Sequence, residues 1–215
     1  MAADKLVPPR VIERGIDLQS PIGSLPLHIR RQRADFPRHQ GYLRADPQRV
    51  ADWRTCLAAL GPGLKVGISW QGGTHKSRRP VRSMPVTQWL PILQAEDIHF
   101  VDLQYTDSGA ELAALRAATG VHVHSWQETR TDYEQTAALV TALDLVISVC
   151  TAVIHLGGAL GRPVWVMAPF SPEWRYGIAG DSIPWYPSLR VFRQPSYGAW
   201  DAVITSVADS LRDLR

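Results

Sequence analysis

Three side chains able to bind a ligand follow one apolar run. The run LVISV at 145–149 is followed at once by Cys150 and Thr151, and His155 comes four residues later. A thiol at the start of a helix can act as a nucleophile, because the helix lowers its pKa. The neighbouring sequence supplies no dedicated base and orienting group for such a thiol. We therefore interpret Cys150 as a small turn residue, and Thr151 and His155 as candidate ligand-binding residues.

The elements around these residues form a strand–turn–helix–strand pattern. The run at 145–149 predicts a buried strand, Thr151 stands at a helix N-cap, and residues 152–160 supply the helix. Gly161 suits the left-handed position that ends a helix, and residues 164–167 return to strand. Two parallel strands joined by a helix place the turn at the carboxyl end of a strand, where open α/β sheets bind ligands. The amides that open the helix would accept a phosphate.

A second group of candidate residues is basic and lies in the loop 72–82. Its cations are Lys76, Arg78, Arg79 and Arg82. Arginine can hold phosphate oxygens through two parallel hydrogen bonds, so this loop could clamp a phosphate. The alternative is a solvated, charged loop. We expect no nucleic-acid partner, because the basic cluster is single and short and the net charge is only +3.

Apolar runs alternate with helical patterns from residue 64 onward, which predicts an α/β fold. Strands are expected at 64–69, 99–103, 121–124, 145–149, 164–167 and 190–192, and helices at 47–60, 88–94, 109–118, 133–143, 152–160 and 200–214. This alternation favours a Rossmann-like three-layer α/β/α sandwich with a mostly parallel sheet. We expect residues 46–215 to form this domain. Residues 1–45 read as a linker or the remnant of another domain, with an extended segment at 22–29.

Parallel strands bring their carboxyl ends to one edge of the sheet, and the residues leaving these ends are polar and aromatic. They are Trp70–Gly73, Gln104–Asp107, Ser125–Gln127, Cys150–Thr151 and the segment from Pro169 onward. Aromatic rings, amides and a helix N-terminus together suit a nucleotide.

Several classes of protein are disfavoured by the sequence. Two cysteines in 215 residues predict no disulfide framework, and a reducing cytoplasm is the expected location. No apolar run is long enough to span a bilayer. We expect no metal or other cofactor, because His122 and His124 lack further ligands at a suitable spacing. A nicotinamide enzyme is disfavoured, since no G-x-G-x-x-G motif is present.

Several segments resemble one group of bacterial glycosyltransferases. They are KVGISWQGG, RSMPVTQWLPIL, FVDLQ, DYEQTAALVTALDLVISVCTAVIHLGGALGRPVWVMAPFSPEWRY and PWYPSLRVFRQ. This group is similar to the ADP-heptose:lipopolysaccharide heptosyltransferases, and many of its members follow tetratricopeptide repeats. The resemblance covers roughly residues 20–205 and implies one half of a GT-B fold, the C-terminal half that holds a nucleotide sugar.

The resemblance also implies roles for individual residues. Ser69, Trp70, Gln71, Gly72 and Gln104 would line the nucleotide pocket. Thr151, Ala152 and His155 would meet the diphosphate, and Trp174 and Arg175 would close the donor side. Lys76, Arg78 and Arg82 are further candidate phosphate contacts. Catalytic residues are not assigned.

Two departures from the family pattern leave open whether this chain alone turns over substrate. The family usually has an acceptor domain before this half, which residues 1–45 are too few to form. A separate N-terminal half or a second copy of the chain would then have to supply it. The family also usually has aspartate where this chain has Cys150. The alternative is a catalytically inactive module that binds a protein partner through its half-cleft, with Trp70, Trp126, Trp174 and Trp185 as anchors.

Overall fold

The computed structural model describes residue 15, residues 17–73 and residues 78–214. Contacts within the chain divide it into two compact units, Met1–Pro37 and Arg38–Arg215. Each unit is described by itself.

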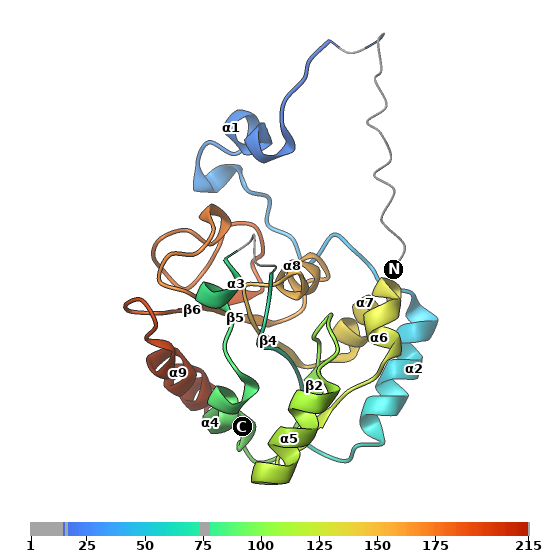
Figure 1. Ribbon diagram of the computed structural model, residues 1–215. Helices are drawn as coiled ribbons and strands as arrows, with labels where there is room; N and C mark the ends of the chain where they lie inside the picture. Colours follow the sequence, from blue (N-terminus) through green and yellow to red (C-terminus); the bar gives the residue numbers. More distant parts are fainter. Residues whose placement is uncertain (1–14, 16, 74–77, 215) are drawn as a thin grey trace, which may run out of the picture. The chain divides into compact units, whose positions relative to one another are not determined.

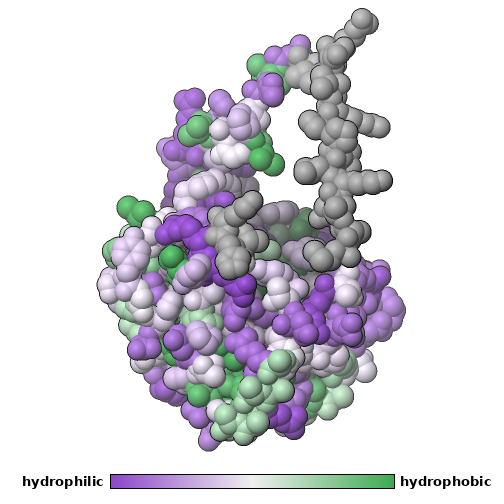
Figure 2. All heavy atoms as spheres, viewed as in Figure 1, coloured by the Kyte–Doolittle hydropathy of each residue, from purple (hydrophilic) through white to green (hydrophobic). Residues whose placement is uncertain are grey.

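The described part of the first unit is a set of short helical turns. They are η1 (Ile22–Ser24), α1 (Leu25–Ile29) and η2 (Arg33–Asp35), and none has a buried residue. The expectation of an extended segment at 22–29 is therefore wrong. Pro26 lies in the first turn of α1, where its fixed φ favours a helix and its lack of an N–H costs nothing. Figure 2 shows green, hydrophobic side chains on this unit, in agreement with the exposure of Leu27 and Ile29.

The second unit is built on a six-stranded sheet in which every pairing is parallel. The strands are β1 (Leu64–Ser69), β2 (Ile98–Asp102), β3 (Val123–His124), β4 (Leu145–Val149), β5 (Val164–Ala168) and β6 (Leu189–Arg193). Their order across the sheet is β3-β2-β1-β4-β5-β6. This is the strand order of a doubly wound Rossmann sheet, so the predicted fold class is confirmed. The order reverses between β1 and β4, where such sheets bind ligands.

Helices cover both faces of this sheet (Figure 1). One face packs against α4 (Leu90–Leu93), α5 (Gly109–Thr119) and α9 (Trp200–Arg212), and the other against α2 (Pro47–Ala58), α7 (Tyr133–Ala142) and α8 (Ala152–Ala159). Alternate strand residues face the two helix layers. Ile147 packs in the core on the side of α4, α5 and α9, and Val146 packs in the core on the side of α2, α7 and α8. Among the residues that the structure describes, no helix combines the length and the apolar composition that a bilayer crossing needs.

Short elements differ from the sequence predictions more than long ones. The helix expected at 88–94 is a 3₁₀ turn, η4 (Val86–Trp89), followed by α4, with Pro91 in the first turn of α4. The strand expected at 121–124 pairs only at Val123–His124. The helix expected at 47–60 ends at Ala58, although Asp46 caps it as predicted, by accepting from the amides of Gln48 and Arg49.

Residues 39–43 belong to the second unit. The Tyr42 and Leu43 amides donate to the Ala159 carbonyl at 2.7 and 2.9 Å, and a His39 ring nitrogen lies 3.0 Å from the Trp185 carbonyl oxygen. This stretch, which the sequence placed in a linker or remnant, therefore packs against the end of α8.

On the face seen in Figure 2, hydrophilic and hydrophobic residues of the second unit are interspersed.

Candidate functional site

The turn between β4 and α8 lies at the carboxyl edge of the sheet, as the sequence predicts. Thr151 occupies the N-cap position of α8, but its side chain makes no cap hydrogen bond. Its hydroxyl instead lies 2.9 Å from the Ser148 hydroxyl oxygen. The Thr151 side chain therefore does not satisfy the first amides of α8, and the helix start keeps its capacity to bind an anion.

The loop after β1 is held by one buried amide side chain. The Gln104 Oε1 atom accepts from the Ser69 hydroxyl at 2.6 Å, the Trp70 amide at 3.1 Å and the Gln71 amide at 3.3 Å. Gln104 is only 4% exposed, so these bonds are sheltered from water. Three donors on one acceptor fix the path of the chain as it leaves β1.

This loop approaches the start of α8 closely at Gly72. A Cβ atom at Gly72 would lie 2.5 Å from the Thr151 Cγ2 atom, so only glycine fits without a shift of that side chain. The Gly72 amide donates to the Ser83 hydroxyl at 3.0 Å, and the Tyr105 hydroxyl donates to the Gly73 carbonyl at 3.1 Å. The exits of β1, β2 and β4 are thereby joined.

A polar hollow of about 410 Å³ opens beside this junction. Its charged and titratable lining residues are Arg82, Cys150, His155, Glu173, Arg175 and Tyr176, and Gly73, Tyr105, Thr151 and Ala152 complete it. Two guanidinium groups near a helix N-terminus make an environment that suits the oxygens of a diphosphate.

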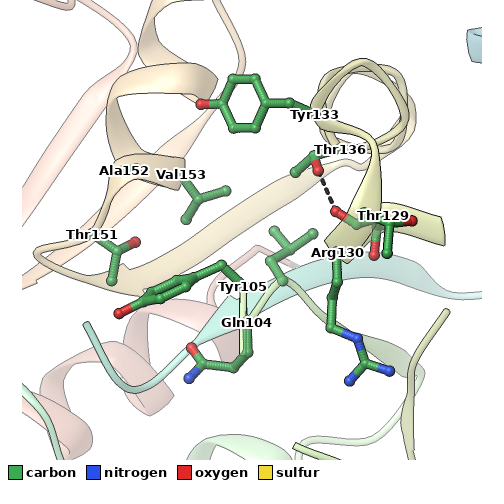
Figure 3. A pocket seen from close by; sticks show the side chains of 11 residues that line it. Gln104, Tyr105, Thr129, Arg130, Tyr133, Thr136, Thr151, Ala152 and Val153 are labelled. Atoms are coloured by element: carbon green, nitrogen blue, oxygen red, sulfur yellow. Dashed lines mark hydrogen bonds between the residues drawn. The ribbon is translucent and has the colours of Figure 1, made fainter. Parts of the chain in front are cut away.

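A second, more apolar hollow of about 240 Å³ shares Tyr105, Thr151 and Ala152 with the first. Figure 3 shows the Tyr133 ring, from the start of α7, and the Tyr105 ring on opposite sides of this hollow, with Val153 between them. Thr136 closes its back and donates to the Thr129 carbonyl at 2.5 Å. The two aromatic rings and the few polar atoms of this hollow suit a flat, mostly apolar group.

Burial favours the neutral form of three side chains in the polar hollow, those of Cys150, Tyr176 and His155. Burial raises the pKa of the Cys150 thiol to about 12, which agrees with its interpretation as a turn residue rather than a nucleophile. Burial also raises the pKa of Tyr176. The pKa of His155 is lowered by burial and by Arg175, so its imidazole is neutral at pH 7. A His155 ring nitrogen lies 3.3 Å from the Tyr176 hydroxyl.

The residues predicted to line the nucleotide pocket do not all reach it. Ser69 and Trp70 are 1% and 0% exposed, and the Trp70 indole lies in the core, where its N–H donates to Glu111 at 3.0 Å. They support the loop instead of lining a hollow. Trp70 is therefore excluded as an exposed anchor for a protein partner. Gln71 has a half-buried side chain whose carbonyl oxygen accepts from Arg79 at 2.6 Å.

The donor-side residues and the basic loop are distributed over the polar hollow and its rim. The Arg175 guanidinium lies 5.8 Å from the ring centroid of Trp174, which is 59% exposed. Arg82, from α3 (Arg79–Arg82), forms an ion pair with Glu173 at 2.7 Å. Arg78 borders only a small adjacent hollow, and Lys76 lies outside the described residues.

Several lining residues were not singled out from the sequence, among them Tyr133, Glu173 and Tyr176. Tyr105 belongs to the strand exit Gln104–Asp107 that the sequence indicated, although no individual role was assigned to it. Glu173 and Tyr176 flank the assigned pair Trp174–Arg175 and come from the loop after β5. Tyr133 was not indicated by the exit rule, because the short helix α6 (Glu128–Thr131) separates it from the exit of β3.

A histidine cluster lies apart from the site, with His99 on β2, His124 on β3 and His122 immediately before β3. The His124 ring centroid lies 4.4 Å from that of His122 and 5.8 Å from that of His99. Burial, and then the neighbouring histidines, lower the pKa of His124 to about 4. Among the described residues, no group of three histidine, cysteine or acidic side chains is placed to hold a metal ion.

Comparison with known proteins gives one curated relative. No protein-family model matches the chain. The chain is 36% identical over 201 residues to Protein FlbA of Caulobacter vibrioides, and the match covers 92% of this chain. The chain spans 33% of the length of that relative.

Solved structures show what the fold is. A glycosyl transferase family 9 protein from Veillonella parvula superposes with a TM-score of 0.59 over 81% of this chain and 54% of its own, at 11% identity. The E. coli heptosyltransferase WaaC, solved with ADP-2-deoxy-2-fluoro heptose, gives a TM-score of 0.50 over 72% of this chain and 44% of its own, at 19% identity. The chain has a glycosyltransferase-like fold. The resemblance that the sequence segments carry is thus confirmed at the level of the fold.

Proposed function

We propose that this chain is the nucleotide-sugar-binding domain of a glycosyltransferase, which transfers a sugar from a nucleotide diphosphate sugar to an acceptor. The glycosyltransferase-like fold supports a sugar-transfer role in general. The observation that carries the more specific proposal is the meeting of two unlike hollows at Thr151–Ala152.

The two hollows divide the work of binding such a donor. The nucleotide base and ribose lie in the apolar hollow between Tyr105 and Tyr133, and the diphosphate lies at the start of α8. Arg82 and Arg175 stabilise the charge that develops on the departing diphosphate, which needs no metal ion. Neutral His155 donates one hydrogen bond, to a phosphate oxygen or a sugar hydroxyl.

The acceptor side of the reaction requires groups beyond those described here. The acceptor hydroxyl needs a base to accept its proton. We propose that a separate N-terminal half of the GT-B type, or a second copy of the chain, supplies this side. The chain spans about half of the solved structures that it matches.

Calorimetric titration with ADP, UDP and GDP tests the proposal. We expect saturable binding of at least one of them, and a loss of roughly tenfold or more in affinity in Ala152→Trp, because the exposed Ala152 lines both hollows. Ala117→Trp is the matched control, because Ala117 is exposed on α5 and lines neither hollow. Absence of binding at millimolar nucleotide would refute the proposal and favour the inactive, protein-binding module, for which Trp174 is the exposed tryptophan.

A further inference from the structure

The polar hollow contains a carboxylate where an anion is expected to bind. Glu173 pairs with Arg82 at 2.7 Å, and their side chains are 28% and 15% exposed. Both residues line the same hollow as Arg175 and His155. An acid is an unexpected neighbour for a diphosphate, because its charge repels the ligand.

The ion pair joins two segments that are far apart in the sequence. Arg82 ends α3, beyond the loop that follows β1, and Glu173 immediately precedes η5 (Trp174–Tyr176), beyond the loop that follows β5. The charge of Glu173 raises the pKa of His155, in opposition to burial and Arg175, and it adds to the effect of burial on Cys150. The charge of Glu173 therefore acts on residues at the start of α8, and not only on Arg82.

A carboxylate and a phosphate present the same kind of oxygen to a guanidinium group, so they compete for it. We propose that Glu173 pairs with Arg82 in the ligand-free protein. When a nucleoside diphosphate binds, one of its phosphates replaces Glu173 as the partner of Arg82. This inference rests on the proposed function, because it concerns the same hollow. Glu173 is then a specificity-determining residue: a weakly charged ligand leaves the pair intact, and a diphosphate displaces it.

The exchange lowers the affinity for diphosphates and leaves the base subsite unaffected. Breaking a partly exposed ion pair costs about as much as a two- to fivefold change in affinity. The Glu173→Gln variant removes the competing charge and keeps the size of the side chain. We therefore expect it to bind pyrophosphate and a nucleoside diphosphate about two- to fivefold more tightly than the unchanged protein.

The experiment compares calorimetric titrations of the full chain with ADP, UDP, GDP, pyrophosphate and the corresponding nucleosides. The variants are Glu173→Gln, Arg82→Gln and the double variant, with thermal melting as a check on folding. Asp209→Asn is the matched control, because Asp209 pairs with Arg212 on α9 and lines none of the hollows described above. If Glu173→Gln fails to fold, Glu173→Asp replaces it, since its shorter side chain must loosen the same contact.

The inference is supported if Glu173→Gln tightens diphosphate and pyrophosphate binding, if nucleoside binding is unchanged, and if the double variant binds like Arg82→Gln alone. It is overturned, with the proposed function intact, if the unchanged protein binds a diphosphate and Glu173→Gln binds it equally or more weakly. An equal gain in Asp209→Asn also overturns it, because the effect would then reflect net charge. Absence of diphosphate binding in every variant refutes the proposed function and the inference together.

Discussion

Replacement of Gln104 by leucine should remove the hydrogen bonds that hold the loop after β1. The Oε1 atom of Gln104 accepts from the Ser69 hydroxyl and from the Trp70 and Gln71 amides. Leucine has a similar size but no acceptor, so the three donors lose their partner. A buried donor without a partner costs about 1–3 kcal/mol.

The three donors do not contribute equally. The Trp70 amide is fully buried and carries the largest cost, whereas the Ser69 hydroxyl can rotate, and water can reach the half-buried Gln71. We therefore expect Gln104→Leu to lower the free energy of unfolding by about 3 kcal/mol. Urea denaturation followed by circular dichroism measures this change. Gln94→Leu is the matched control, and it should change stability by less than about 0.5 kcal/mol, because Gln94 is exposed.

A double-mutant cycle with Ser69→Ala separates the loss of an acceptor from the loss of packing. Ser69→Ala removes one of the donors, so Gln104→Leu should cost less in its presence. A cost below about 1 kcal/mol for Gln104→Leu alone, or strict additivity in the cycle, would refute the reasoning, because the bonds would then not anchor the loop.

Three further predictions concern other parts of the second unit. Because the folded-state pKa of His124 is about 4, below the ordinary 6.5, the unfolded chain binds more protons between these values. Stability should therefore fall as the pH is lowered from 6.5 to 4, by about 1 kcal/mol after allowance for solvent screening, and His124→Gln should flatten the dependence in urea titrations. Cys150 should react with iodoacetamide at pH 8 only as the chain unfolds, whereas the half-buried Cys56 should react in the folded protein. Mass spectrometry of the alkylated peptides distinguishes the two cysteines, and equal reaction rates would contradict the burial of Cys150. Arg193 donates to the carbonyls of Tyr176, Gly177, Ala179 and Gly180, so Arg193→Lys should speed proteolysis at 176–180, and an unchanged cleavage rate would count against this role.

The long alternating elements could be predicted from the sequence because burial dictates their residue types. The strands at 145–149 and 164–168 are apolar at every position except Ser148. Such continuous apolar runs of strand length are typical of parallel strands that are buried on both faces. The segment 22–29 lacks such a pattern, and its one proline, Pro26, suits both an extended chain and the first turn of a helix.

The position of the candidate site could be predicted, but its detailed composition could not. The strand-exit rule placed Gln104 and Thr151 at the correct edge of the sheet. It gave no sign that Ser69 and Trp70 point into the interior, because a residue at a strand exit can face the core or the cleft. The pairing of Arg82 with Glu173 joins residues 91 positions apart, and only the folded topology brings them together.

The most direct test of the account is a map of amide chemical shifts during titration of the ¹⁵N-labelled chain with a nucleoside diphosphate. The account predicts that the largest changes fall on Tyr105, Thr151 and Ala152, which line both hollows, and that Gly120, at the end of α5, does not move. Shifts centred elsewhere on the sheet, or no saturable shifts at millimolar ligand, would contradict the claim that the start of α8 is a diphosphate site.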